Sequence, residues 1–427
     1  MRNVLILSSP NPTRSAGIVA LDIKKALESK NDFKVEVIVK DTYDSETPGV
    51  KSFYSKLYGL NKRVQNKIKR ELGVANSIKT DPDYYVLTPD ASKLSLKTKK
   101  ILKLGSFQPD IIVATFIYNF ISFRHLYELQ QKTGALVILY MMDMAAVTGG
   151  CHFAWNCDGY LKACGKCPAY YSDTGNDLSR VNWEFKKKYI DQMNIALVAG
   201  SDGLDQQTHQ SSLFKAVPKS KLLLPIDDDV FRKKDHGVAR KALGLPEEKK
   251  LILFGAVSTW EKRKGLKELV DCLHKLKAML TKDSPEVELL VAGKSQEDFL
   301  NSLPFKCHAL GFMNHQGLSQ AYNAADVLVS PSIEDSGPMM INQSLMTGTP
   351  VVSFNIGVGP DLIENGSTGY MADLPNTDQM AEGIFRILHK SEAEYAQMSE
   401  ACNKMASEKT NMNIFLKNFK ELLSALE

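Results

Sequence analysis

Long hydrophobic runs are absent from this 427-residue sequence, as are the compositional biases of fibrous and disordered chains. No stretch reaches the roughly 18 uncharged apolar residues of a membrane-spanning helix. The opening apolar run, Val4–Leu7, is too short for the core of a signal peptide. With 44% hydrophobic and 24% charged residues, the chain has the composition of a globular protein. We therefore expect a folded cytoplasmic protein.

Cysteine is scarce and charge is nearly balanced. Seven cysteines, an odd number without a secretion signal, argue against a disulfide framework and leave metal binding or packing. The net charge of +4 is unevenly spread, because 51–103 holds thirteen basic and four acidic residues. Aromatic residues such as Phe53, Tyr54 and Tyr58 alternate with these cations, which suits peripheral binding to an anionic membrane surface. A solvated basic face is the alternative, and without a recognition module we expect no nucleic-acid partner.

The length predicts two domains, because a single core stops growing near roughly 250–300 residues. In the first half we expect a helix at 18–29 and strands at 4–7, 34–41, 110–115, 135–140 and 195–199. In the second half we expect helices at 264–280, 317–325 and from 338, between strands at 249–257, 287–293, 307–312, 326–332 and 349–355. This alternation predicts an α/β protein with two doubly wound, Rossmann-like domains, 1–225 and 226–410. The apolar face of 411–427 predicts a final helix that packs back onto the protein.

The turn at 334–337 lies between an expected strand and a helix that opens at Pro338. A helix N-terminus binds phosphate through free amides and its dipole. We expect the amides of Gly337, Met339 and Met340 to serve this purpose beside Ser336, with Gly337 allowing close approach of an anion. An ordinary capped turn is the alternative.

The motifs around this turn resemble those of group 1 glycosyltransferases, family 4 in the carbohydrate-enzyme classification. The resemblance rests on Glu334, Gly348–Val352, Gly357–Asp361 and Glu364–Gly369, in the family's order and spacing. It implies the GT-B architecture, in which two Rossmann-like domains face each other across a cleft. Asn342 departs from the pattern, since the family usually has there a glutamate that binds the nucleotide ribose.

The resemblance also implies roles for individual residues. Glu334 would contact the donor sugar, and Lys264, in the segment 258–265, would stabilise the departing diphosphate. The family's arginine a few residues earlier is missing here, since Ala256 follows Gly255, and we expect Arg263 to take its place. A solvated basic face is the alternative for these two cations. Gly17, after the first strand, would approach the donor, and a simple packing turn is the alternative for this glycine. The first domain would bind the acceptor.

A cysteine-rich insertion, 148–170, contains Cys151, Cys157, Cys164 and Cys167. The cysteine pair at 164 and 167, with two further thiols nearby, predicts a structural zinc site without an open coordination position. A cluster of reduced thiols and a redox or disulfide role are the alternatives. The same stretch resembles a bacterial branch of the family, which implies a catalytic role for Asp143. A turn-capping role for Asp143 is the alternative. For His152 a supporting or packing role and a catalytic role are equally open.

These features predict a retaining glycosyltransferase that moves a hexose-type sugar from a nucleotide diphosphate sugar to a hydroxyl acceptor. The resemblance favours surface polysaccharide synthesis, with a glycan or lipid-linked glycan as acceptor. Catalysis would require no cofactor. A nucleotide-sugar epimerase and a catalytically silent scaffold of the same fold are the alternatives.

Overall fold

The computed structural model describes residues 1–10, 16–41, 49–55, 61, 64, 68, 78–86, 90–258, 261–294 and 297–426. The chain divides into two compact units. Unit 1 contains Met1–Gly200, Leu204–Leu222 and Leu416–Glu427. Unit 2 contains Ser201–Gly203 and Leu223–Phe415.

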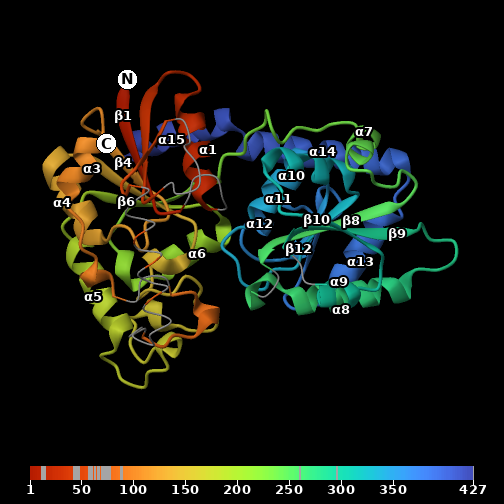
Figure 1. Ribbon diagram of the computed structural model, residues 1–427, viewed down its shortest axis with the longest axis horizontal. Helices are drawn as coiled ribbons and strands as arrows, with labels where there is room; N and C mark the ends of the chain where they lie inside the picture. Colours follow the sequence, from red (N-terminus) through yellow and green to blue (C-terminus); the bar gives the residue numbers. More distant parts are fainter. Residues whose placement is uncertain are drawn as a thin grey trace. The chain divides into compact units, whose positions relative to one another are not determined.

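Unit 1 is built on a parallel sheet with the strand order β3-β2-β1-β4-β5-β6-β7 (Figure 1). Its strands are β1 (Arg2–Ser8), β2 (Phe33–Val39), β3 (Val50–Ser52), β4 (Ile111–Ala114), β5 (Leu136–Met141), β6 (Ile195–Ala199) and β7 (Lys219–Lys221). The chain reverses its direction of travel across the sheet between β1 and β4. In open α/β sheets, ligands bind beyond the carboxyl ends of the strands at such a switch point.

The helices of unit 1 follow the strands in alternation. They are α1 (Ala16–Glu28), α3 (Thr98–Leu104), α4 (Phe123–Thr133), α5 (Leu178–Ile190), most of α6 (Asp202–Gln210) and, from Leu416 onward, α15 (Met412–Leu426). The last of these packs against the sheet, because the Phe419 ring meets the Phe33 ring edge-on at 5.7 Å. Lys420 also forms an ion pair with Asp32.

Unit 2 repeats this strand order on a second parallel sheet, β10-β9-β8-β11-β12-β13. Its strands are β8 (Lys250–Ser258), β9 (Val287–Lys294), β10 (Cys307–Gly311), β11 (Val327–Ser330), β12 (Val351–Phe354) and β13 (Gly369–Ala372). Its helices are α7 (His236–Ala242), α8 (Leu266–Met279), α9 (Glu297–Asn301), α10 (His315–Ala324), α11 (Met339–Met346), α12 (Gly359–Leu362), α13 (Thr377–Leu388) and α14 (Glu392–Thr410). Here the switch point lies between β8 and β11.

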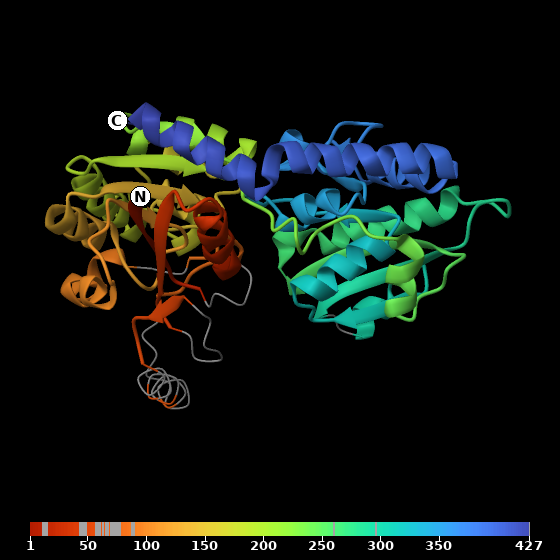
Figure 2. The same ribbon diagram turned by 90° about the horizontal axis from the view of Figure 1, so that it is seen from above.

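Helices cover both faces of the second sheet. In Figure 1, α8 and α13 pack together on one face, and α10 and α11 lie on the other. The long helix α14, blue in Figure 2, packs on α11. Because both faces are covered, the central strands are apolar throughout, as in Leu251–Leu253, which are fully buried.

The expectation of two doubly wound, Rossmann-like folds is confirmed by these two sheets. The short edge strands β3, β7 and β13 and the helix α14 were not expected from the sequence. Within the described ranges, no helix is both long enough and apolar enough to cross a membrane.

Candidate functional site

Two loops meet at the switch point of unit 2. One follows β8 and contains a short 3-10 turn, η7 (Lys262–Lys264); the other follows β11 and leads into α11. The backbone N–H of Ile333 donates a 2.8 Å hydrogen bond to the carbonyl of Arg263, which joins the loops directly. Thr259 and Trp260 lie outside the described residues.

Gly265 sets how closely the two loops approach. Its φ is +66°, and a Cβ at this position would lie 1.7 Å from the carbonyl oxygen of Pro331. Only glycine fits this left-handed conformation and this contact. The close approach brings the preceding residue, Lys264, against the loop that follows β11.

Asp335 is the centre of the polar contacts between the loops. One carboxylate oxygen receives Lys264 Nζ at 2.5 Å and Arg263 Nη1 at 3.0 Å. The other accepts the backbone N–H of Gly337 at 3.2 Å. Burial alone would raise the pKa of Asp335, but Lys264 and Arg263 outweigh it and lower that pKa, so the carboxylate is ionised.

Glu334 has the opposite environment although it is the adjacent residue. Burial, and secondly the negative charge of Asp335, raise the pKa of Glu334 to about 7, against the opposing effect of Arg263. Near neutral pH this carboxyl can therefore donate or accept a hydrogen bond. Such a group suits recognition of sugar hydroxyls.

The N-terminus of α11 offers two backbone donors. The amides of Met339 and Met340 have no acceptor within the part of the chain that the structure describes. The Gly337 amide, expected to be open, is instead bonded to Asp335. Gly337 has a φ of +155°, and a Cβ there would lie in ordinary van der Waals contact with Ser201 at 3.5 Å and Val358 at 3.6 Å.

Two other expected donor residues are buried beside this helix end. Ser336 is 8% exposed and Asn342 is 2% exposed. Their neighbour Gln343 accepts a hydrogen bond from the Tyr322 hydroxyl at 3.0 Å, which fixes that turn of α11 to α10. The residues expected to form the donor site lie in these two loops and in the first turns of α11: Arg263, Lys264, Glu334, Ser336, Gly337, Met339, Met340 and Asn342.

Sequence reasoning missed Asp335. A single acid next to Glu334 carries no signal by its spacing. The available signal was the pair of adjacent cations at 263 and 264, because partly buried cations at a loop crossing require a carboxylate partner. Their side chains are only 17% and 23% exposed.

In unit 1, Asp143 follows β5 and has both carboxylate oxygens engaged. One accepts the Ala145 amide at 2.9 Å, capping a 3-10 turn, and the other lies 2.8 Å from His152 Nδ1. The capping role and the role beside His152 therefore coexist. Because both Asp143 oxygens are engaged, the polar atom of this pair that has no partner among the described residues is His152 Nε2.

Aromatic rings enclose His152. The Tyr118 and Phe116 rings lie 4.7 Å and 5.3 Å from its ring, and His152 is 1% exposed. Its Nε2 has no hydrogen-bond partner among the described residues, and the same holds for the buried hydroxyls of Ser8 and Thr115 at the ends of β1 and β4. These two hydroxyls were missed from the sequence, where their strand-end position was the only signal.

Gly17 is the second residue of α1 and is buried. The preceding residues 11–15 lie outside the described chain. The predicted role of Gly17 toward a donor therefore stays a prediction.

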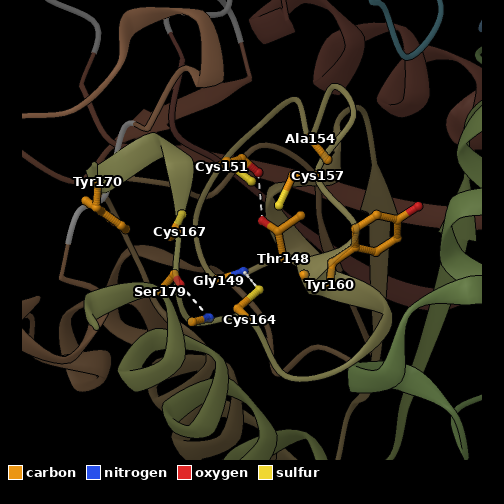
Figure 3. Close-up of a pocket in the computed structure, with 12 residues that line it drawn as sticks. Thr148, Gly149, Cys151, Ala154, Cys157, Tyr160, Cys164, Cys167, Tyr170 and Ser179 are labelled. Carbon is orange, nitrogen blue, oxygen red and sulfur yellow. Dashed lines mark hydrogen bonds between the residues drawn. The ribbon is translucent and has the colours of Figure 1, made fainter. Parts of the chain in front are cut away.

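The four cysteines of the insertion line one small pocket (Figure 3). All four are free thiols. Burial is the main cause that raises the pKa of Cys164 to about 12, and it also raises the pKa of Cys151 and Cys167. No three His, Cys, Asp or Glu side chains in the described ranges already stand in metal-binding geometry.

Parts of the basic segment 51–103 lie outside the described residues, namely 56–60, 62–63, 65–67, 69–77 and 87–89. Phe53, expected among surface aromatics, is 4% exposed and packs in the core. Lys100 stacks over its ring at 4.3 Å. Lys99 and Lys103 on α3, and Lys97 at its N-cap, are exposed.

Comparison with known proteins gives a family match within unit 2. Residues 236–406 match the family model described as "Glycosyl transferases group 1". An uncharacterized glycosyltransferase of Methanocaldococcus jannaschii is 28% identical over 156 residues. That match covers 35% of this chain, and this chain spans only 38% of the length of that relative.

Solved structures resemble the whole chain in fold. Sucrose-phosphate synthase from Thermosynechococcus elongatus has a TM-score of 0.67 at 15% identity, with 100% of this chain and 99% of the other covered. HepE of Anabaena, solved in complex with UDP and glucose, has a TM-score of 0.62 at 14% identity, with both chains fully covered. At this identity the likeness shows only the fold. It extends over both units of this chain, because each match covers the full chain.

Proposed function

We propose that residues 236–406 form a group 1 glycosyltransferase domain, and that the protein transfers a sugar from a nucleotide diphosphate sugar to a hydroxyl acceptor. One observation carries the proposal. Arg263, Lys264 and Asp335 link the two loops at the switch point of unit 2, beside the open amides of α11. Sheets of this type bind nucleotides at that position. The UDP and glucose held by HepE support a donor of this class.

The donor diphosphate would take the N-terminus of α11. Its charge suits the amides of Met339 and Met340 and the positive end of the helix dipole. Lys264 would meet the phosphates, because an ammonium has three N–H donors and Asp335 is its one acceptor among the described residues. Asp335 would then act as a positioning residue that holds this cation in place.

Glu334 would bind hydroxyls of the donor sugar, and Asn342 would take the place at which the family binds ribose. The chemical step breaks the bond between the anomeric carbon and the phosphate oxygen while the acceptor oxygen bonds to the same face of that carbon. The acceptor proton passes to the departing phosphate oxygen, so configuration is retained without a protein nucleophile. Lys264 and Arg263 stabilise the charge that develops on the diphosphate.

We further propose a glycan or lipid-linked glycan as acceptor, in surface polysaccharide synthesis at the cytoplasmic face of a membrane. The excess of cations in 51–103 supports this location, since each Lys or Arg near an anionic surface adds about 1 kcal/mol of attraction. Exposed lysines on α3 are the described part of that surface. Sedimentation with liposomes that contain or lack anionic lipid tests this point: salt-insensitive binding, or none, would refute it.

The donor is tested by calorimetric titration of the purified chain with UDP, GDP and ADP, followed by a panel of their sugars. We expect one diphosphate to bind, and the matching sugar nucleotide to raise the unfolding temperature. A saturating ligand at 100 times its Kd adds about 2.7 kcal/mol of stability. Absence of binding to every diphosphate would favour a silent scaffold, and release of an epimerised sugar nucleotide without acceptor would favour an epimerase.

A further inference from the structure

The cysteine-rich insertion is a long irregular segment inside a compact unit. Between Val147 and Asp177 the only regular elements are two single 3-10 turns, Gly159–Leu161 and Pro168–Tyr170. Four residues without glycine's freedom have a positive φ here: Trp155, Cys164, Lys166 and Tyr171. Each such residue has a backbone conformation that is strained for a side chain with a Cβ. Loops of this length are usually either functional or disordered, so an ordered one needs an additional stabilising interaction.

The thiols of this segment converge. Cys151, Cys157, Cys164 and Cys167 approach the same cavity from different parts of the loop, as Figure 3 shows. The volume of this cavity is about 20 Å³. A site needs roughly 10–15 Å³ to hold one water molecule, and a metal ion needs no more.

The pair of cysteines at 164 and 167 is fixed by the surrounding backbone. The Gly149 amide donates to Cys164 Sγ at 3.2 Å, which leaves that sulfur with an N–H donor directed at it. The amide of Cys167 donates to Asp177, the N-cap of α5, at 2.7 Å. Between them, Gly165 has no room for a Cβ, which would lie 2.3 Å from the carbonyl oxygen of Gly175. The turn is therefore held rigidly against the start of α5.

A buried cation beside the pocket lacks a carboxylate. Lys186 is 3% exposed, and its ammonium donates to the carbonyl oxygens of Ala145 at 2.5 Å and Thr148 at 2.8 Å. Thr148 itself lines the cysteine pocket. Within the described chain, Lys186 forms no ion pair with Asp or Glu. Burying a charge is costly unless an opposite charge compensates it.

We propose that Cys151, Cys157, Cys164 and Cys167 bind one structural zinc ion as thiolates. Soft thiolate ligands select zinc over magnesium or calcium, and four cysteines close the tetrahedral shell. Binding releases the four thiol protons and gives a centre with a net charge of −2. That charge offsets the buried ammonium of Lys186. The four side chains must turn toward a common centre, because none of their groupings already has metal-binding geometry.

The zinc would also order the backbone beside the Asp143–His152 pair of unit 1. Cys151 directly precedes His152, whose ring is paired with Asp143 at the end of β5. A metal that fixes Cys151 fixes the backbone of this pair. The ion would thus support the site from outside, without contact with substrate. This inference goes beyond the proposed transfer reaction and does not depend on it.

The first test is elemental analysis and zinc K-edge X-ray absorption on the full chain, purified without chelator. We expect one zinc per chain, with four sulfur neighbours at about 2.3 Å. Cys164→Ser should abolish stoichiometric zinc. Cys307→Ser, a half-buried cysteine on β10 of unit 2, is the matched control and should keep one zinc.

A second measurement covers the case in which Cys164→Ser does not fold. In the unaltered chain, four thiols should resist alkylation until a strong chelator removes zinc, and the alkylated sites should be the four of the insertion. Four results would each overturn the proposal. They are a full zinc content in Cys164→Ser, nitrogen and oxygen ligands in place of sulfur, absence of zinc from the unaltered chain, and a disulfide within the insertion.

Discussion

The two units share one strand order but place different chemistry at their switch points. In unit 2, Gly265 brings two loops into contact and a buried carboxylate, Asp335, gathers two cations. In unit 1, the corresponding edge of the sheet carries a histidine enclosed by aromatic rings and paired with Asp143. Strand order therefore determines where a site forms, whereas the loops determine what the site can bind.

The largest effect is expected from a substitution that prevents the close approach of the two loops in unit 2. Gly265→Ala adds a Cβ against the Pro331 carbonyl and forces an alanine into the left-handed region. We expect a loss of about 2–5 kcal/mol in the free energy of unfolding, together with loss of transfer activity. Denaturant unfolding and a transfer assay measure both.

Gly311→Ala is the matched control. Its φ of +65° is nearly that of Gly265, but no atom lies within 4 Å of its added Cβ. It should lose only about 1–2 kcal/mol from the backbone conformation. Equal losses of unfolding free energy in the two variants would show that the contact with Pro331 does not contribute to the cost of Gly265→Ala.

The next largest effect should come from the cation. Lys264→Ala removes the ammonium that would face the departing diphosphate, while Arg263 remains on Asp335. We expect kcat to fall by roughly 10²–10³, the scale of one preorganised electrostatic group. Lys262→Ala, an exposed lysine of the same turn, should leave kcat unchanged. A fall shared by both variants would point to general loss of positive charge instead.

A smaller effect is expected in unit 1. Asp143→Asn keeps the shape of the side chain but removes the charge paired with His152. Loss of a charge-assisted hydrogen bond costs about 1.5–3 kcal/mol, so kcat/KM for the acceptor should fall roughly 10- to 150-fold. The Kd for the nucleoside diphosphate should not change, because that ligand is assigned to unit 2.

Asp90→Asn separates this effect from loss of a cap. Asp90 caps another 3-10 turn of unit 1 by accepting the Ser92 amide at 3.1 Å, without a histidine partner. It should leave acceptor kinetics unaltered. If Asp143→Asn also left the acceptor kinetics unaltered, Asp143 would act only as a turn cap.

The smallest predicted change is a pH dependence specific to unit 2. Since the pKa of Glu334 is raised to about 7, the carboxyl is protonated below that pH and ionised above it. If the carboxylate accepts sugar hydroxyls, kcat/KM for the donor should rise as pH increases through about 7. Glu334→Gln should flatten this step. An unchanged profile in the variant would assign the titration to another group.

Much of the fold follows from the sequence, because parallel strands buried on both faces have continuous apolar runs. The strand expected at 195–199 agrees with β6 at both ends, and the one expected at 287–293 differs from β9 by a single residue. The edge strands were missed for the converse reason. β7, with the sequence Lys-Ser-Lys, is polar and short, so no hydrophobic pattern marks it.

The donor-site residues were also accessible from sequence, since they are grouped in two short loops whose place in the fold follows from the strand order. Pairings across the chain were not. The contact of Asp335 with Lys264 joins residues 71 positions apart, and the bond from the Gly337 amide to Asp335 depends on the local turn. Neither of these contacts can be predicted from the spacing of the residues in the sequence.

Because Leu416–Glu427 belongs to unit 1 while the preceding 193 residues belong to unit 2, synthesis on the ribosome completes the two units out of order. Unit 2 can finish folding while Phe33 still lacks the Phe419 ring that covers it. During that interval the nascent first unit exposes an apolar surface, the kind of surface that chaperones bind and that promotes aggregation. Shortening α15 would prolong this vulnerable stage without altering a single residue of either switch point.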